Sequence, residues 1–359
     1  MKAAVLKAFG TPLSVEDIPA PVLGTGEVIV DVVATKVLAY AGEVFSGARD
    51  YQMELPIVPG SGAIGQVRAF GPDATRLAVG DWVYCDPTVR SRDDARAPDI
   101  ILQGLIAPGD GGLRLARHFH DGTFAEQTRV PTENATRIGQ IEAGEASSWC
   151  ALGTLLVPYG GLLAVGLQSG EVVVGNGATG SFGSAAVAVA LGMGAACVIA
   201  TGRNAEALKD LERRFGARVR TVPMRGAEAE DRAQIFATAP GPIDVVFDIL
   251  PPAATIDQVR TAVMSVRPNG RVALMGGVGI AGGPGLDLPY PWLMRNNITV
   301  QGQWMYPPDA ALRMTALIRA GLVDLGQFWA TEFALDDINA AVAHAADNAG
   351  PFKMTIVRP

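Results

Sequence analysis

The chain has 359 residues, 49% of them hydrophobic, and its 36 Asp and Glu outnumber its 29 Lys and Arg to give a formal net charge of −7. At about 150 residues per domain this length predicts about two domains, and the composition excludes a disordered or fibrous chain. The acidic balance without a basic cluster argues against a nucleic-acid partner, and three widely spaced cysteines exclude a disulfide scaffold and favour a reducing, cytoplasmic environment.

Strands are predicted over the first part of the chain, up to about residue 145, because runs rich in Val, Ile, Tyr and Phe are bounded by Gly, Pro and Asp. Helical periodicity is weak here, so we expect a domain built mainly from strands. The predicted strands are Lys2–Lys7, Glu27–Val37, Gly65–Phe70, Asp81–Cys85 and Phe124–Val130.

A long uncharged stretch follows from residue 146 to 170, and a second runs from 172 to 202. A membrane helix needs about 20 mostly apolar residues, which this length would allow. Pro158 and repeated glycines break the stretch into short pieces, however, and such pieces are typical of a buried parallel sheet. We therefore expect no membrane partner, and Lys2, Lys7 and Glu16 argue against a signal peptide.

From about Gly170 onward, strands alternate with helices, which predicts a doubly wound parallel sheet. One of the helices should begin after Asn204, whose side chain can cap it, and end at Gly216. Two later helices are predicted at Ala310–Ala320 and Asp336–Ala346. The predicted strands are Val172–Gly175, Ala196–Thr201, Val219–Val222, Asp244–Ile249, Arg271–Met275, Ile298–Gln303 and Met354–Val357.

The sequence VVVGNGATGSFG, residues 172–183, joins the first of these strands to a helix. Glycines in such a turn let the backbone bend sharply and approach a pyrophosphate held at the N-terminus of the helix. The strand before it and the helix after it are the context that the motif requires. We predict a dinucleotide site, with a purely structural turn as the alternative, at Gly177, Ala178, Thr179, Gly180, Ser181, Phe182 and Gly183.

The end of the second strand indicates which dinucleotide is preferred. An Asp or Glu about 20 residues past the glycines would bind the ribose 2′-hydroxyl of NAD, but this chain has Thr201, Gly202, Arg203 and Asn204 there. Gly202 makes room, and the Arg203 guanidinium could pair with a 2′-phosphate. The pattern favours NADPH over NADH, with a solvated Arg203 beside a capping Asn204 as the alternative.

Further motifs occur at VVATKV (32–37), LPIVPGSGAIGQV (55–67), VGDWV (79–83), DGTFAE (121–126) and FKMTIV (352–357). Together with the glycine turn they resemble the medium-chain dehydrogenase/reductase superfamily over essentially the full chain, and the turn itself resembles its quinone-reductase branch. The resemblance implies a GroES-like β-barrel substrate domain at 1–148, a Rossmann domain at 149–288 and a return segment at 289–359 that completes the first domain. It also implies a homodimer formed through the strand at Ile298–Gln303.

The chain departs from the zinc-dependent members of that family. They carry a catalytic Cys where this chain has Leu38, a His-Glu pair where it has Ser61 and Gly62, and a last Cys near which Cys150 lies a few residues early. A catalytic zinc needs three protein ligands, and a structural zinc typically needs four thiolates, whereas the lobe at about 86–120 contains no cysteine. We expect no metal site, and we interpret His118 and His120 as a surface pair.

Without a metal to polarise a plain ketone, an acceptor that is already activated is the easier substrate. Tyr40 falls where zinc-dependent relatives carry the Ser or Thr that relays a proton, so we predict that it is the hydrogen-bond donor, or else a pocket wall. Ser61, Trp292 and Trp304 are candidate pocket residues, although both Trp side chains could instead belong to the core. Gly276 and Gly277 would let the backbone approach the nicotinamide end of the cofactor.

The sequence thus predicts a zinc-independent, NADPH-dependent reductase of an α,β-unsaturated carbonyl or a quinone. Two alternatives stay open. One is a metal-free carbonyl reductase or alcohol dehydrogenase, and the other is an NADPH-binding redox sensor without turnover.

Overall fold

The computed structural model describes residues 1–280 and 282–359, which form two compact units. The first unit comprises Met1–Gly153, Leu325–Ala349 and Lys353–Pro359, and the second comprises Thr154–Asp324 and Gly350–Phe352. Residues 289–324, which the resemblance assigns to the return segment, thus lie with the second unit. The reason is that the strand at residues 299–302 pairs with the strand at residues 271–274 in the parallel sheet of the second unit.

The first unit is built around a seven-stranded sheet in which β3 has a central position. Its order is β16-β17-β3-β4-β5-β9, and β8 also pairs with β3. Two small sheets, β1-β2 and β6-β7, accompany it. The strands are β1 (Lys2–Val5), β2 (Ser14–Asp17), β3 (Glu27–Val37), β4 (Ala63–Phe70), β5 (Trp82–Cys85), β6 (Thr88–Arg90), β7 (Ile100–Leu102), β8 (Gln127–Pro131), β9 (Ala135–Arg137), β16 (Trp329–Ala334) and β17 (Lys353–Arg358).

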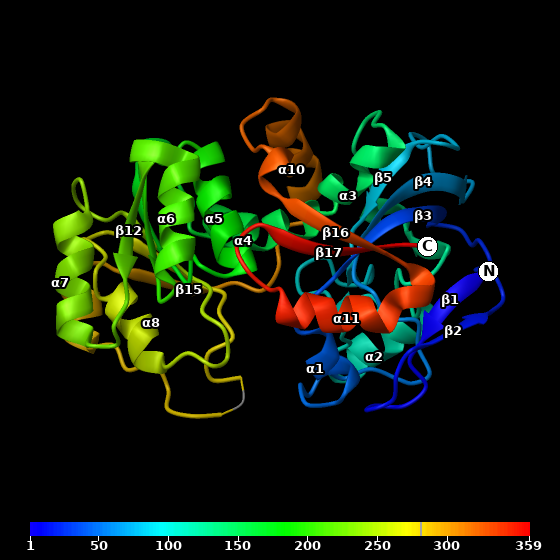
Figure 1. The fold of residues 1–359 in the computed structure, drawn as a ribbon, viewed down its shortest axis with the longest axis horizontal. Coiled ribbons are helices and arrows are strands. Elements are labelled where there is room, and N and C mark those ends of the chain that lie inside the picture. Colours follow the sequence, from blue (N-terminus) through cyan, green and yellow to red (C-terminus); the bar gives the residue numbers. More distant parts are fainter. Residues whose placement is uncertain (281) are drawn as a thin grey trace. The chain divides into compact units, whose positions relative to one another are not determined.

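Alternating valines explain why β3 lies at the centre of this sheet. Val28, Val30 and Val32 point to one face and form a core with residues of β4, β5, β8 and β9, as the period of two in a strand requires. The C-terminal strand β17 pairs antiparallel with the other end of β3, and Figure 1 shows these two strands side by side. The first and last parts of the chain therefore share one sheet.

Short helices surround this sheet. The lobe at 86–120 contains the helix α2, because Leu113 and Leu115 pack on a small apolar core that includes Ile101 and Phe119. Three of the first four residues of this helix are glycines, which are poor helix formers, so the sequence pattern does not indicate a helix here. The helices are α1 (Ala41–Phe45), α2 (Gly109–His118), η1 (Thr132–Asn134), η2 (Ala143–Glu145), α3 (Ala146–Trp149), η4 (Leu325–Gln327), η5 (Leu335–Asp337) and α11 (Ile338–Asp347).

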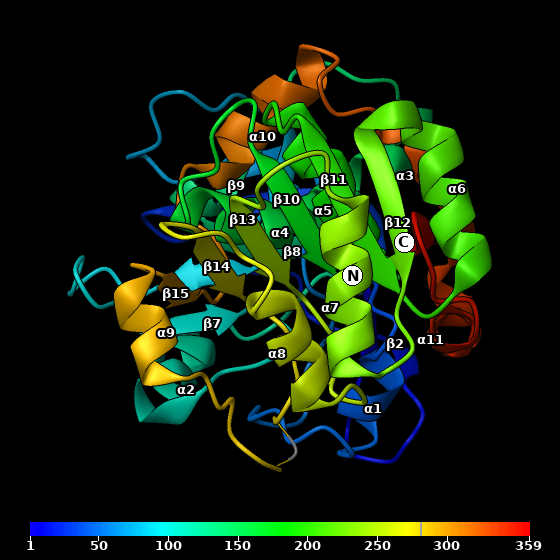
Figure 2. The same ribbon diagram turned by 90° about the vertical axis from the view of Figure 1, so that its left-hand side faces the viewer.

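The second unit is a parallel sheet with the order β12-β11-β10-β13-β14-β15. This confirms the predicted doubly wound sheet, whose strand order reverses at β10 and β13. The helices α7 and α8 pack together and lie in front of the strands in Figure 2. The strands are β10 (Val172–Asn176), β11 (Cys197–Gly202), β12 (Val219–Pro223), β13 (Val245–Asp248), β14 (Arg271–Leu274) and β15 (Thr299–Gly302).

The helices of this unit begin and end largely where local signals place them. Asn204 accepts hydrogen bonds from the backbone of Glu206 and Ala207 and so caps α6, and Gly216 with φ of 62° ends it, as predicted. The helices are α4 (Leu152–Ala164), α5 (Ser181–Gly192), α6 (Ala205–Phe215), η3 (Gly216–Arg218), α7 (Glu228–Thr238), α8 (Ile256–Val263), α9 (Tyr290–Arg295) and α10 (Ala310–Arg319).

The uncharged stretch at 146–170 folds as α3 and α4, so the expectation of sheet strands there was wrong. Pro158 lies inside α4, and close packing explains the glycines, since a side chain at Gly160 or Gly161 would collide with Tyr306 or Met275. The run Ala143–Ala164 has the length and hydropathy of a membrane helix, but most of it is buried within the protein. It therefore has the character of a core helix.

Candidate active site

The candidate dinucleotide turn lies at the point where the strand order of the parallel sheet reverses. β10 ends at Asn176, and the turn begins at Gly177, whose φ is 93°. That conformation favours glycine because it has no Cβ. The Ala178 amide donates to the Thr201 carbonyl at 2.9 Å and the Gly180 amide to the Gly177 carbonyl at 3.1 Å, so the turn is tied to β11 and to itself.

Two further glycines allow close approaches in this turn. A Cβ on Gly183 would overlap the carbonyl oxygen of Gly177, and a Cβ on Gly202 would lie 2.8 Å from the Thr179 hydroxyl. Gly180 differs, because its Cβ would lie 3.6 Å from the nearest atom, which is an ordinary contact. The turn is thus held in one shape by contacts that only glycine permits at positions 183 and 202.

The N-terminus of α5 is suited to an anion. Gly180 is its N-cap and supplies no side-chain cap, and the first turn of any helix leaves backbone amides without intrahelical partners. The helix dipole adds a partial positive charge at the same end. The backbone and the glycine turn therefore fit a dinucleotide pyrophosphate.

Arg203 follows directly after β11 and is exposed. Within residues 1–280 and 282–359 its guanidinium makes no hydrogen bond or ion pair, whereas neighbouring arginines such as Arg214 pair with Asp210. Asn204 is committed to capping α6. The Arg203 side chain is therefore available to a phosphate at this corner.

A buried polar row underlies the turn, and the sequence prediction missed it. The Thr201 hydroxyl donates to Asn176 Oδ1 at 2.8 Å, and Asn176 Nδ2 donates to Asp248 Oδ1 at 2.7 Å. Burial raises the pKa of Asp248 to about 7, against the opposing effect of hydrogen bonds from Asn176 and the Leu250 backbone. The available signal was a polar residue at the end of each of three apolar strands.

Gly276 and Gly277 follow β14, and both lie close to the end of β13. The Gly277 amide donates to the Leu250 carbonyl at 2.8 Å, and a Cβ on Gly276 would lie 2.6 Å from Asp248 Oδ2. Gly276 and Gly277 therefore pack on residues 248–250, the same segment that Gly177 approaches.

In the first unit, Tyr40 immediately precedes α1 and belongs to a cluster of polar and aromatic groups. The Arg49 guanidinium lies 4.2 Å from its ring centroid, and the Tyr51 ring meets it edge-on at 6.3 Å. Arg49 also pairs with Glu43 at 2.9 Å. Burial and the neighbouring Tyr51 raise the pKa of Tyr40 above its usual value, so the phenol stays protonated well beyond neutral pH and can donate a hydrogen bond.

Ser61 lies half-buried in the loop before β4, and Gly62 beside it has φ of 84°. The Thr35 and Thr123 hydroxyls both contact the Gly62 carbonyl, at 2.9 and 3.2 Å. Throughout the described ranges, 1–280 and 282–359, no three His, Cys, Asp or Glu side chains come together as a metal-binding group would require.

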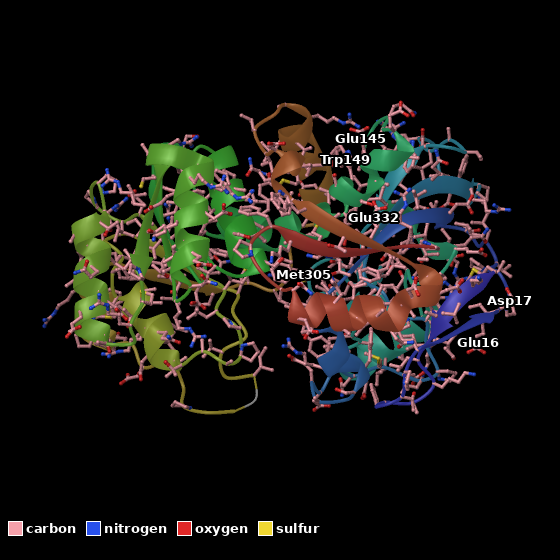
Figure 3. All side chains as sticks on the ribbon, viewed as in Figure 1. Glu16, Asp17, Glu145, Trp149, Met305 and Glu332 are labelled. Carbon is pink, nitrogen blue, oxygen red and sulfur yellow. The ribbon has the colours of Figure 1, made fainter. Side chains whose placement is uncertain are left out.

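Lys36 is a buried cation in β3 that the sequence prediction also missed. It is 9% exposed, and burial lowers its pKa to about 8, against the opposing effect of Cys150. The Cys150 thiol is buried too, with its pKa raised to about 12. Nearby, the Ser147 hydroxyl on α3 donates to the Glu332 carboxylate on β16 at 2.5 Å. Figure 3 labels Glu332 and also Trp149, the last residue of α3.

We expect Lys36 to make stability depend on pH. Its pKa is about 8 in the folded chain against 10.5 for an unperturbed lysine, so between these values the unfolded chain binds more protons and stability rises with pH. Lys36→Met should remove this rise and stabilise the fold at pH 7 by up to about 3 kcal/mol, at about 1.4 kcal/mol per pKa unit. Urea unfolding at pH 7 and pH 10 measures both. The exposed Lys353→Met is the control, and an unchanged pH dependence in Lys36→Met would contradict the expectation.

The remaining candidate residues take separate places. His118 Nε2 contacts Glu27 Oε1 at 2.7 Å and His120 Nδ1 contacts Asp121 Oδ1 at 3.0 Å, so the two imidazoles have different partners. Trp292 packs on the core of the parallel sheet, whereas Trp304 is 48% exposed. Of the two Trp side chains, only Trp304 offers a large exposed surface.

Two protein families match separate parts of the chain. Residues 24–140 match the alcohol dehydrogenase GroES-like domain, and residues 182–320 match the zinc-binding dehydrogenase family. The first match confirms the GroES-like domain that the resemblance implied.

Similar proteins include the L-threonine 3-dehydrogenase of Streptomyces coelicolor, 25% identical over 98% of this chain and 97% of that one. The acryloyl-coenzyme A reductase of Metallosphaera sedula is 28% identical over 55% of this chain and 58% of that one. A zinc-binding dehydrogenase from Sinorhizobium meliloti, solved with NADP bound, superposes with a TM-score of 0.77 at 20% identity and covers 100% of this chain and 99% of that one. This last likeness shows the fold.

Proposed function

The chain belongs to the medium-chain dehydrogenase/reductase superfamily, whose members are dinucleotide-dependent oxidoreductases, and from this premise we propose that it is a zinc-independent, NADPH-dependent reductase of activated acceptors. The acceptor class is an α,β-unsaturated carbonyl or a quinone. The proposal is carried by a glycine turn that fits a pyrophosphate, together with Leu38, Ser61 and Gly62 where the resemblance places residues of the catalytic zinc site. The acryloyl-coenzyme A reductase relative, whose named substrate contains a conjugated carbonyl, supports this acceptor class.

In this proposal NADPH, when bound, supplies the hydride. The backbone amides at the start of α5 hold the pyrophosphate, and the Gly276–Gly277 segment leaves room for the nicotinamide end. The Tyr40 hydroxyl donates a hydrogen bond to the acceptor oxygen, on which negative charge develops during reduction, and such preorganised donors are a main source of rate enhancement. Ser61, which belongs to the same unit as Tyr40, is a further candidate for contact with the acceptor.

Arg203 provides the cofactor preference in this proposal. Arg203→Ala should raise the KM for NADPH about 10-fold and leave that for NADH unchanged, since a charge-assisted bond to phosphate is lost only with NADPH. Steady-state kinetics with both cofactors measure the effect. Arg213→Ala, which removes an exposed arginine paired with Asp210 on the same helix, is the matched control. Equal changes for NADPH and NADH would contradict the assignment.

The second candidate is a metal-free carbonyl reductase or alcohol dehydrogenase, which the similarity to an L-threonine 3-dehydrogenase favours. We further propose that the protein is a homodimer, because β15 is an edge strand of the parallel sheet and can pair with a second copy. We also propose that it acts in the cytoplasm, a reducing environment that suits its three free cysteines.

The test follows NADPH and NADH absorbance with an enone, a quinone, an aldehyde and a ketone, with and without chelator, and measures bound zinc. NADPH consumption with enone or quinone that chelator leaves unchanged is the expected result. Turnover with aldehyde or ketone alone would favour the second candidate. Loss of activity with chelator, together with stoichiometric zinc, would overturn the metal-free assignment.

A further inference from the structure

Asp248 is a buried carboxyl group beside Asn176, the residue that precedes the candidate dinucleotide turn. It is 2% exposed and ends β13, next to β10. Strand register places Asn176 opposite both Asp248 and Thr201, so the three side chains form one row across three parallel strands. The row lies at the carboxyl ends of the strands, which is where open parallel sheets bind their ligands.

Each hydrogen-bonding position of Asn176 in this row has a partner. Its Oδ1 accepts from the Thr201 hydroxyl at 2.8 Å, and its Nδ2 donates to Asp248 Oδ1 at 2.7 Å and to the Gln258 carbonyl at 3.2 Å. Asp248 is the side chain that accepts from Nδ2, so it fixes which way the Asn176 amide points. A buried network in which every member is satisfied specifies one geometry.

The row supports three glycines of the candidate site. Gly177 follows Asn176 and Gly202 follows Thr201 in the sequence, while Gly276 lies against Asp248, where a Cβ would come within 2.6 Å of Oδ2. The Ile249 amide also donates to the Asn176 carbonyl at 3.1 Å. A change at Asp248 therefore reaches the beginning of the dinucleotide turn and the glycine pair after β14 together.

We propose that Asp248 is a positioning residue for the dinucleotide and that its neutral form is the one that binds the anionic cofactor, so that cofactor binding takes up a proton. This inference rests on the cofactor assignment of the proposed function.

Neutral groups surround Asp248 on the elements packed against it. β10 contributes Asn176, and the glycines after β14 contribute backbone. On α8, Asp257 is exposed and Arg260 pairs with Glu228 at 2.7 Å. At the far end of β14, Arg271 pairs with Glu171. A negative charge on Asp248 therefore has no cation among these groups to offset it, and burial holds its pKa at about 7.

The direction of the pH effect follows from this pKa. Below pH 7 the carboxyl is neutral, and above it a buried negative charge forms next to the site for the pyrophosphate and nicotinamide. Like charges repel strongly where the dielectric constant is low, so affinity should fall as pH rises through 7. Binding above pH 7 should then shift Asp248 toward its protonated form and draw a proton from solvent.

The experiment is calorimetric titration of the full-length protein with NADH, which lacks the titrating 2′-phosphate, from pH 6.0 to 8.5 in buffers of different ionisation enthalpy. For the wild type we expect the Kd to rise about 10-fold over this range, since affinity falls by up to tenfold per pH unit above the pKa. Proton uptake should be measurable at pH 7.5. Asp248→Asn, which is neutral at every pH, should show neither effect.

Two variants separate charge from hydrogen bonding. Asp248→Leu removes the acceptor for Asn176 Nδ2 and should bind about five-fold more weakly at every pH, because an unsatisfied buried donor is costly. Asp231→Asn is the matched control: Asp231 is equally buried but accepts from the Arg225 and Gly226 backbone, away from the row. It should behave as the wild type does.

The outcomes distinguish this inference from the proposed function. If the wild type binds NADH without proton uptake, or if Asp248→Asn keeps the uptake and the pH dependence, the inference is overturned while the cofactor assignment stands. If the wild type binds neither NADH nor NADPH, the cofactor assignment fails and the inference fails with it.

Discussion

Replacing Gly183 with Ala should weaken NADPH binding by at least about 100-fold, which corresponds to about 2.7 kcal/mol. The added methyl would overlap the Gly177 carbonyl oxygen, and backbone atoms on both sides prevent either residue from yielding without a shift of the whole turn. The amides at the start of α5 would then no longer point at the pyrophosphate. Fluorescence titration with NADPH measures the loss.

The matched control is Gly180→Ala in the same turn. Its Cβ would lie 3.6 Å from the nearest atom, and its φ of −91° suits any residue, so its affinity should stay within about two-fold of the wild type. Circular dichroism and thermal unfolding show whether Gly183→Ala still folds. A folded Gly183→Ala protein with wild-type affinity would mean that this turn does not hold the cofactor.

Replacing Tyr40 with Phe should lower kcat by about 100-fold, within the range that a single acid–base or hydrogen-bonding group contributes. The substitution keeps the ring that Arg49 covers and removes the hydroxyl alone. Because the pKa of Tyr40 is raised above its usual value, the wild-type phenol is protonated throughout the neutral range, and the loss should be the same at pH 6 and pH 8. Steady-state kinetics with the preferred acceptor measure it.

Two measurements distinguish the loss of the Tyr40 hydrogen bond from a general disturbance of the structure. NADPH affinity should be unchanged in Tyr40→Phe, because the turn residues that hold the cofactor are intact. Tyr159→Phe, which removes another buried phenol hydroxyl beside Arg313, should keep wild-type kcat. If Tyr40→Phe retains full activity, Tyr40 is a wall of the pocket and another group donates the hydrogen bond.

The elements that depend on neighbouring residues in the sequence were predictable. The bounds of β3 agree with the prediction at both ends, since valine alternation and flanking turns are local signals. Asn204 and Gly216 end α6 as expected for the same reason. The glycine turn was found because its motif occupies consecutive residues, 172–183.

The parts that depend on tertiary neighbours were not predictable. α4 was expected to be sheet because its glycines resemble strand punctuation, whereas in the fold they admit Tyr306 and Met275. The row of Thr201, Asn176 and Asp248 requires the register of three strands that are distant in sequence. A single chain's pattern does not supply that register.

The pairing of β17 with β3 has a consequence for how the protein is made. Residues 353–358 are synthesised after every other strand of the first unit's sheet, yet they pair with its central strand β3. The stretch 154–324 is complete before then, and chains grow at about 5–20 residues per second. During synthesis the parallel sheet can therefore fold before β17 is available to pair with β3. Until then, part of one edge of β3 is accessible to chaperones or to another nascent chain.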